Sequence, residues 1–201
     1  MMIGEIEAAL RARGLSCIAG VDEVGRGPLA GPVVAAAVIL PENFDGEGIT
    51  DSKALSPARR EALAARITRQ AATALAYVPA PEIDRLNIHG ATLLAMRRAV
   101  LALPIQPVFV LADGKFTPKD LPCPAQAVVK GDARVLAIAA ASIVAKVARD
   151  RLMATVEIHF PGYAFAKNAG YPTSFHKNSL KKIGLTPLHR LSFAPCKALL
   201  G

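Results

Sequence analysis

Two adjacent carboxylates at the end of an apolar segment are the residues of this sequence best suited to chemistry. Asp22 and Glu23 lie in the run IAGVDEVGRGP, residues 18–28, where they follow an apolar stretch and precede a glycine-rich turn. Paired acids at the end of a buried strand repel each other and lose hydration unless a cation compensates them. The pattern therefore predicts a metal site, beside a glycine backbone that a ligand can approach closely.

Two further acids follow apolar segments in the same way. Asp113 comes after the apolar residues 107–112, and Asp132 follows the segment 125–129. In open α/β sheets, ligands bind beyond the carboxyl ends of the strands. Carboxylate oxygens suit Mg²⁺ and Mn²⁺, and two such ions can activate water and stabilise the leaving oxygen of a phosphodiester. The four acids are therefore predicted metal ligands and catalytic residues, although Asp132 alone is equally well explained as a helix N-cap.

The elements that must position these acids alternate between strand and helix. Apolar periodicity and turn residues predict strands at 16–22, 32–40, 72–78, 107–112 and 125–129. Helices are predicted at 57–74 with Ser56 as N-cap, at 81–86, at 87–100 with Asn87 as cap, and at 133–157. The short glycine turn between the first two strands favours an antiparallel pair. The order predicts an α/β fold.

The composition predicts one domain with a polyanionic partner. The chain has 201 residues, of which 52% are hydrophobic, and a net charge of +8. This length can bury a single core, and a basic surface attracts phosphates. Residues 158–201 carry six lysines and arginines and no acid. We expect a catalytic core at 1–157 and a basic, mainly helical substrate-binding segment at 158–201, together forming one continuous domain.

The location expected from the sequence is the cytoplasm. Cys17, Cys123 and Cys196 share no metal-ligand spacing and are typical of a reduced compartment. The first residues include acids and do not form a secretory signal. The longest apolar run, 135–145, is too short to span a bilayer, and the four histidines include no close pair of the zinc type. Nothing in the sequence demands more than a monomer.

A series of motifs resembles bacterial ribonuclease HII. The motifs are IAGVDEVGRGPLAGP at 18–32, DSKAL at 51–55, ADG at 112–114, VKGD at 129–132, AASIVAKVARD at 140–150, GYPTSFH at 170–176 and HRLSF at 189–193. They occur in the family's order between about residues 17 and 198. The resemblance implies a ribonuclease H-like fold, with a mixed central sheet flanked by helices and a small helical C-terminal part.

The resemblance also implies an activity. Members cleave the RNA strand of RNA/DNA hybrids and cut 5′ of single ribonucleotides embedded in duplex DNA, which contributes to ribonucleotide removal. Matched position by position, the family's metal-binding acids are Asp22, Glu23, Asp113 and Asp132. They would hold two Mg²⁺ or Mn²⁺ ions during hydrolysis, and the products would carry a 3′-hydroxyl and a 5′-phosphate. RNA/DNA hybrids and DNA duplexes containing ribonucleotides are the expected partners.

The resemblance assigns substrate contacts as well. Gly25, Arg26 and Gly27 match the backbone sensor of the ribose 2′-hydroxyl, the group that distinguishes RNA from DNA. From the residues alone, an ordinary glycine turn explains them equally well. Tyr171 matches a tyrosine whose ring packs on the neighbouring sugar, and Lys53 lies in a motif that approaches the phosphate backbone.

Helix spacing adds two residues whose roles the sequence leaves open. Ser142 and Lys146 lie one turn apart on the predicted helix 133–157, so one face can present a hydroxyl and an ammonium group to phosphate. Either residue can equally be structural. His176 and His189, in the C-terminal motifs, are interpreted as packing residues and not as catalytic bases.

The match contains departures, and two other classes of protein stay open. Leu136, Lys115 and Ala54 stand where the family often has proline, asparagine and lysine, which bears on phosphate contacts but leaves the four acids intact. About fifteen residues precede the first predicted strand, too few for the N-terminal domain of ribonuclease HIII. The alternatives are a junction resolvase-like nuclease of the same fold and a non-catalytic nucleic-acid-binding protein. The sequence does not indicate whether a sliding clamp recruits the protein.

Overall fold

A computed structural model describes residues 3–49, 52 and 55–200 of the chain. The elements in chain order are α1 (Glu5–Ala12), β1 (Ile18–Val24), β2 (Val33–Ile39), α2 (Pro57–Gln70), β3 (Ala72–Val78), α3 (Ala80–Leu101), β4 (Phe109–Asp113), β5 (Ala125–Val128), the 3₁₀ turn η1 (Gly131–Ala133), α4 (Leu136–His159), α5 (Phe165–Asn168), α6 (Ser174–Ile183) and α7 (Ala194–Lys197).

The five strands form one mixed sheet in the order β3-β2-β1-β4-β5. β2 is antiparallel to both β1 and β3, whereas β4 is parallel to both β1 and β5. The carboxyl ends of β1, β4 and β5 therefore lie at the same edge of the sheet. Val21 is aligned with Ala112, so the next residues, Asp22 and Asp113, are neighbours. The mixed sheet confirms the predicted α/β fold and antiparallel first pair.

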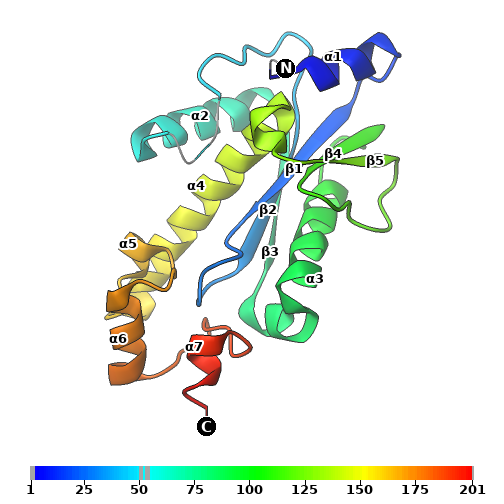
Figure 1. Ribbon diagram of the computed structural model, residues 1–201. Helices are drawn as coiled ribbons and strands as arrows, with labels where there is room; N and C mark the ends of the chain where they lie inside the picture. Colours follow the sequence, from blue (N-terminus) through cyan, green and yellow to red (C-terminus); the bar gives the residue numbers. More distant parts are fainter. Residues whose placement is uncertain (1–2, 50–51, 53–54, 201) are drawn as a thin grey trace.

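Helices cover both faces of the sheet. α3 lies on one face, and α4 with α2 lies on the other (Figure 1). α4 approaches β1 closely because Gly20 has no side chain: a Cβ there would lie 2.3 Å from the carbonyl carbon of Ala137. This backbone contact fixes the distance between the helix and the strand that carries Asp22.

Three predicted helices differ in detail from the observed elements. The Ser56 hydroxyl accepts a hydrogen bond from the Arg59 N–H at 3.3 Å, as expected of an N-cap, but α2 ends at Gln70 because β3 begins at residue 72. The predicted helices 81–86 and 87–100 form the single element α3, with a break at Asn87. The Asn87 side chain accepts from the N–H groups of His89 and Gly90, at 2.9 and 3.1 Å, and so caps the second part.

The structure contradicts the alternative explanation of Asp132 as the N-cap of the long helix. Asp132 lies within η1, and α4 begins three residues after that turn, with Val135 at the N-cap position. Glu7 of α1 satisfies the helix end instead: its carboxylate accepts from the N–H groups of Leu136 and Ala137, at 2.9 and 2.8 Å. Its negative charge also suits the positive end of the helix dipole. A residue distant in sequence therefore leaves Asp132 available for another role.

The C-terminal segment packs against the far end of α4 (Figure 1). Its short helices α5, α6 and α7 enclose an apolar cluster that also includes Leu29, Ala30 and Met153. α4 extends to His159 and so continues through the boundary predicted at 157–158. Within the described ranges, no helix is both long and apolar enough to cross a membrane.

Candidate active site

Three of the four predicted acids converge at the carboxyl edge of the sheet. Asp22, Glu23 and Asp113 each offer a carboxylate oxygen within 4.8 Å of the other two. Alternation along β1 directs Asp22 toward α4 and Glu23 toward α3, while Asp113 ends the neighbouring parallel strand. The strand order and register thus bring together acids separated by ninety residues of sequence.

The electrostatics of this cluster disfavour its charged form. Burial raises the pKa of Asp22 well above its ordinary value, and the carboxylates of Glu23 and Asp113 raise it further. Burial also raises the pKa values of Glu23 and Asp113. Hydrogen bonds offset part of the effect, since the Glu23 N–H donates to Asp22 Oδ1 and the Gly131 N–H donates to Asp113 Oδ1, both at 2.7 Å.

The donor set fits a hard divalent cation. Arg26 contributes positive charge, with Nη1 3.3 Å from Glu23 Oε1, but half of its side chain is exposed. One partly hydrated guanidinium faces three acids, so negative charge remains in excess. Carboxylate oxygens are the ligands that Mg²⁺ and Mn²⁺ prefer. A divalent ion bound by these carboxylates would favour their ionised forms and so offset the effects that raise their pKa values.

Asp132 lies beside this cluster and not among the three converging acids. It is held in η1, directly after Gly131, whose N–H donates to Asp113. Its carboxylate is close enough to raise the pKa of Asp113. The structure therefore brings three predicted ligands together and keeps the fourth adjacent.

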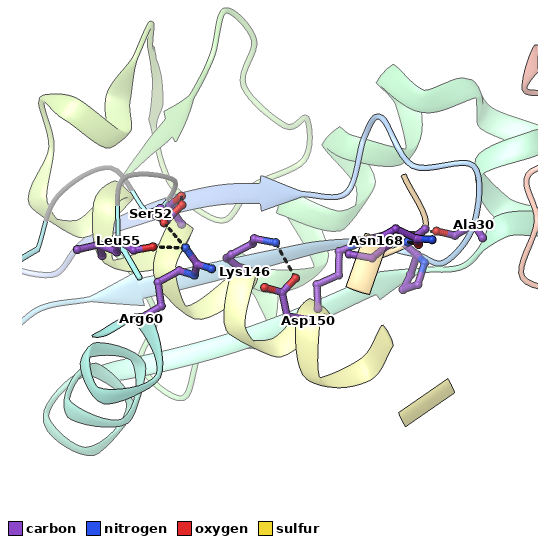
Figure 2. A network of polar contacts seen from close by, with 12 residues as sticks. Ala30, Ser52, Leu55, Arg60, Lys146, Asp150 and Asn168 are labelled. Carbon is purple, nitrogen blue, oxygen red and sulfur yellow. Dashed lines mark hydrogen bonds and ion pairs between the residues drawn. The ribbon is translucent and has the colours of Figure 1, made fainter. Parts of the chain in front are cut away.

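Ser142 and Lys146 have different partners. Ser142 is nearly buried, and its hydroxyl lies 3.0 Å from the hydroxyl of Ser52 and hydrogen-bonds to Asp22. Lys146 Nζ donates to Asp150 at 2.6 Å (Figure 2). Ser142 thus contacts the acid cluster, while Lys146 forms an ion pair along α4.

Lys53 lies outside the described residues, whereas its sequence neighbours Ser52 and Leu55 are described. Arg60 Nη1 donates to the carbonyl oxygens of Ser52 and Leu55, at 2.9 and 2.5 Å (Figure 2). Ser52 in turn contacts Ser142 on α4. These bonds connect Ser52 to both α2 and α4, and Leu55 to α2.

The glycine turn and Tyr171 lie against each other. A Cβ on Gly27 would be 3.4 Å from Tyr171 Cε1, and the tyrosine side chain is 41% exposed. Gly25, with φ 92°, adopts a conformation that favours glycine. Although the loop and the tyrosine are far apart in sequence, the structure forms one surface from an open backbone and an accessible ring.

A cleft of about 80 Å³ lies next to the cluster and includes residues that the sequence did not indicate. Its lining comprises Glu23, Arg26, His89, Thr92, Leu93, Met96, Asp113, Gly114, Lys115 and Phe116. A larger hollow of about 500 Å³ shares His89, Leu93, Lys115 and Phe116 with it. The sequence signal that could have found this surface is the aromatic Phe116, three residues after Asp113, and the structure leaves it 59% exposed.

Known proteins share both the sequence and the fold. The family model for ribonuclease HII matches residues 19–196. Ribonuclease HII of Ruegeria sp. (strain TM1040) is 55% identical over 195 residues, which cover 97% of this chain and 85% of that protein.

Two solved structures are similar to the structure of this chain. Ribonuclease H2 from Pyrococcus horikoshii OT3 aligns with a TM-score of 0.72 and 27% identity, over 90% of this chain and 96% of that one. Ribonuclease HII in the PCNA complex from Archaeoglobus fulgidus aligns with a TM-score of 0.73 and 26% identity, over 88% and 95%. The chain therefore belongs to the ribonuclease HII family and is a ribonuclease H endonuclease.

Proposed function

We propose that this enzyme hydrolyses the RNA strand of RNA/DNA hybrids and cuts 5′ of single ribonucleotides embedded in duplex DNA. Such cutting would begin the removal of ribonucleotides from DNA. The observation that carries the proposal is the adjacency of two features: a cluster of three carboxylates, and an open glycine turn packed beside the ring of Tyr171. We further propose that it acts as a monomer in the cytoplasm.

The residues proposed to hold two Mg²⁺ or Mn²⁺ ions are Asp22, Glu23 and Asp113, together with Asp132. When bound, divalent ions polarise phosphate oxygens and generate a nucleophile from water at neutral pH. The chain contributes the alignment: Gly131 orients the Asp113 carboxylate, and Ser142 and the Glu23 N–H orient Asp22.

The proposed reaction is an in-line displacement at phosphorus. Water attacks the phosphodiester 5′ of the ribonucleotide, and the bond between phosphorus and the 3′-oxygen of the preceding nucleotide breaks. The leaving oxygen takes up a proton and becomes a 3′-hydroxyl, while the phosphate stays on the 5′ end of the ribonucleotide. This assignment of the ends gives the reaction a product that a 5′-phosphate assay detects.

The proposed recognition uses the backbone of Gly25, Arg26 and Gly27 for the 2′-hydroxyl and the ring of Tyr171 for the adjacent sugar. A hydroxyl group both donates and accepts hydrogen bonds, so main-chain groups are suitable partners. The lysines of segment 158–201, which are exposed, and Lys53 would neutralise backbone phosphates. Membership of an endonuclease family argues against a purely nucleic-acid-binding role.

The test compares end-labelled duplexes. One contains a single ribonucleotide, one is all DNA, one is an RNA/DNA hybrid, and one is a ribonucleotide-free four-way junction. We expect Mg²⁺- or Mn²⁺-dependent cutting of the first and third substrates, with a 5′-phosphate on the ribonucleotide and no cutting in EDTA. Equal cutting of the all-DNA duplex would contradict the proposal, and cutting of the junction alone would support the resolvase-like alternative.

Replacing Gly27 with alanine tests the recognition surface without disturbing the fold. A Cβ there would meet Tyr171 at an ordinary contact distance of 3.4 Å, so the melting temperature should stay within about 2 °C. The methyl group narrows the gap between the backbone and the ring, and cleavage at a single ribonucleotide should fall at least about tenfold, as expected when a hydrogen bond is lost.

Gly90→Ala is a matched control for this change. A Cβ at Gly90 would also have its nearest contact at 3.4 Å, with Leu86 on the same helix. It should leave cleavage unchanged. Full activity of Gly27→Ala on the single-ribonucleotide duplex would contradict the proposed role of the turn in recognition.

A further inference from the structure

Arg190 buries its guanidinium against the glycine turn. The side chain is fully buried, and burial, together with the nearby Arg149, lowers its pKa to about 9. Its Nη1 donates to the Arg26 carbonyl at 2.9 Å, and its Nη2 donates to the carbonyls of Gly25 and Gly31 at 2.5 and 2.8 Å. Burying a cation without a carboxylate partner is costly. The hydrogen bonds to three carbonyl groups of one loop offset part of this cost.

Holding these carbonyls fixes the direction of two N–H groups. The peptide bonds of the turn are trans, so each N–H points opposite to the carbonyl of the same peptide unit. Arg190 binds the carbonyls of Gly25 and Arg26 from inside the protein, which directs the N–H groups of Arg26 and Gly27 outward. Both residues are exposed, and no hydrogen-bond acceptor for either N–H occurs among the described residues. Two aligned donors are therefore available to a ligand.

The residue before Arg190 holds Tyr171 through a relay of hydrogen bonds. His189 Nδ1 accepts from the Thr186 N–H at 2.9 Å, which places its proton on Nε2. His189 Nε2 therefore donates to His176 Nε2 at 3.1 Å. His176 then carries its proton on Nδ1, which donates to the Tyr171 carbonyl at 2.9 Å. Both imidazoles are buried and neutral in this arrangement. Arg190 thus contacts the glycine turn, and His189, through His176, contacts the backbone of Tyr171.

We propose that the dipeptide His189–Arg190 is the positioning element for ribonucleotide selectivity: Arg190 aims the N–H groups of the turn, and His189 fixes the backbone that carries the Tyr171 ring. This inference rests on the proposed function. It predicts that Arg190 acts on the discrimination between ribose and deoxyribose, and not on general affinity for duplex DNA.

The experiment measures binding in the non-cleaving Asp113→Asn background. Dissociation constants are determined for an all-DNA duplex and for the same duplex with one ribonucleotide, and their ratio is the selectivity. Arg190→Lys replaces the rigid planar set of guanidinium donors with one nitrogen on a flexible stem, which cannot keep the Gly25, Arg26 and Gly31 carbonyls in the same geometry. It should reduce the selectivity at least about tenfold, with affinity for all-DNA duplex changed less than about twofold.

Arg149→Lys is the matched control. Arg149 is equally buried and also donates to three carbonyls, which belong to Ala30, Pro32 and Ala169. In the described part of the chain it makes no hydrogen bond to the carbonyls of Gly25 and Arg26, whose peptide units carry the two outward N–H groups. Arg149→Lys should lower the melting temperature without lowering selectivity. An equal loss of selectivity in Arg149→Lys and Arg190→Lys would overturn the inference, because general loosening of the loop would then explain both.

A second variant covers the case in which Arg190→Lys does not fold. His189→Gln leaves Arg190 intact but shortens the relay to His176, and it should lower selectivity by a smaller factor. Unchanged selectivity in a folded Arg190→Lys protein, or in His189→Gln where only that variant folds, would refute the positioning role. Absence of selectivity in the Asp113→Asn background alone would instead refute the proposed ribonucleotide recognition.

Discussion

Replacing Asp113 with asparagine is expected to remove most of the activity and to stabilise the metal-free protein. The amide keeps an oxygen that can accept from the Gly131 N–H, which lies 2.7 Å from Oδ1, so the link between β4 and η1 persists. The lost charge removes a metal ligand, and metal ions contribute several kcal/mol to such reactions, which corresponds to a rate loss of about a thousandfold. Initial rates on a single-ribonucleotide duplex in Mg²⁺ measure this loss.

The gain in stability follows from the raised pKa values of the cluster. Because the folded-state pKa values of Asp22, Glu23 and Asp113 are raised, their ionised forms destabilise the fold, and protonation relieves the repulsion. In EDTA at neutral pH, Asp113→Asn should raise the free energy of unfolding by about 1 kcal/mol, or the melting temperature by roughly 3 °C. The difference from the original protein should shrink as the pH falls and the acids become protonated.

Asp120→Asn is the control for this substitution. Asp120 is exposed on the loop after β4 and has φ 53°, a conformation that asparagine tolerates. Activity and stability should both stay unchanged. If Asp113→Asn kept full activity, its assignment as a metal ligand would be wrong. If the variant were less stable than the original protein in EDTA, the electrostatic account of the cluster would be wrong.

The second large effect is expected from alanine at Gly20. A Cβ there would lie 2.3 to 2.6 Å from backbone atoms of Ala137 and Ile138, so the strand and the helix must separate. Overpacking of a rigid core costs about 3 kcal/mol, which lowers the melting temperature by roughly 6–12 °C. Because Asp22 is two residues away and contacts Ser142 of the same helix, the affinity for Mg²⁺ should fall as well.

Thermal unfolding with and without Mg²⁺ measures both effects. The control is again Gly90→Ala, where the backbone is helical and the nearest contact is a side chain. Its stability should stay equal or rise, since alanine favours helix. A Gly20→Ala protein with the original melting temperature would show that α4 is not held at the distance described.

The sequence predicts the sheet and the convergence of the acids because both depend on local patterns. Alternating apolar strands, each ending in an acid, place Asp22, Glu23 and Asp113 at one edge as soon as the strands are parallel neighbours. The break in α3 was also predictable, since Asn87 caps a helix through its own side chain. Such signals lie within a few residues of the feature they determine.

Long-range hydrogen bonds were not predictable from such patterns. No helix was predicted at residues 5–12, yet Glu7 of α1 is the residue that caps α4, some 130 positions away. Arginine is rarely buried, so Arg149 and Arg190 read as surface charges of a basic protein. Only the fold shows that their hydrogen-bond partners are carbonyl groups of a distant loop.

The contact between Arg190 and the glycine turn joins residues that are made at very different times during synthesis. The acids are complete once residue 132 has been made, and the sheet and Glu7 are then already present. The carbonyls of Gly25 and Arg26 in the turn accept hydrogen bonds from an arginine about 165 positions later. Because the chain is made from its N-terminus, the four acids exist before the arginine that holds the turn, and the contact that fixes the turn is completed last.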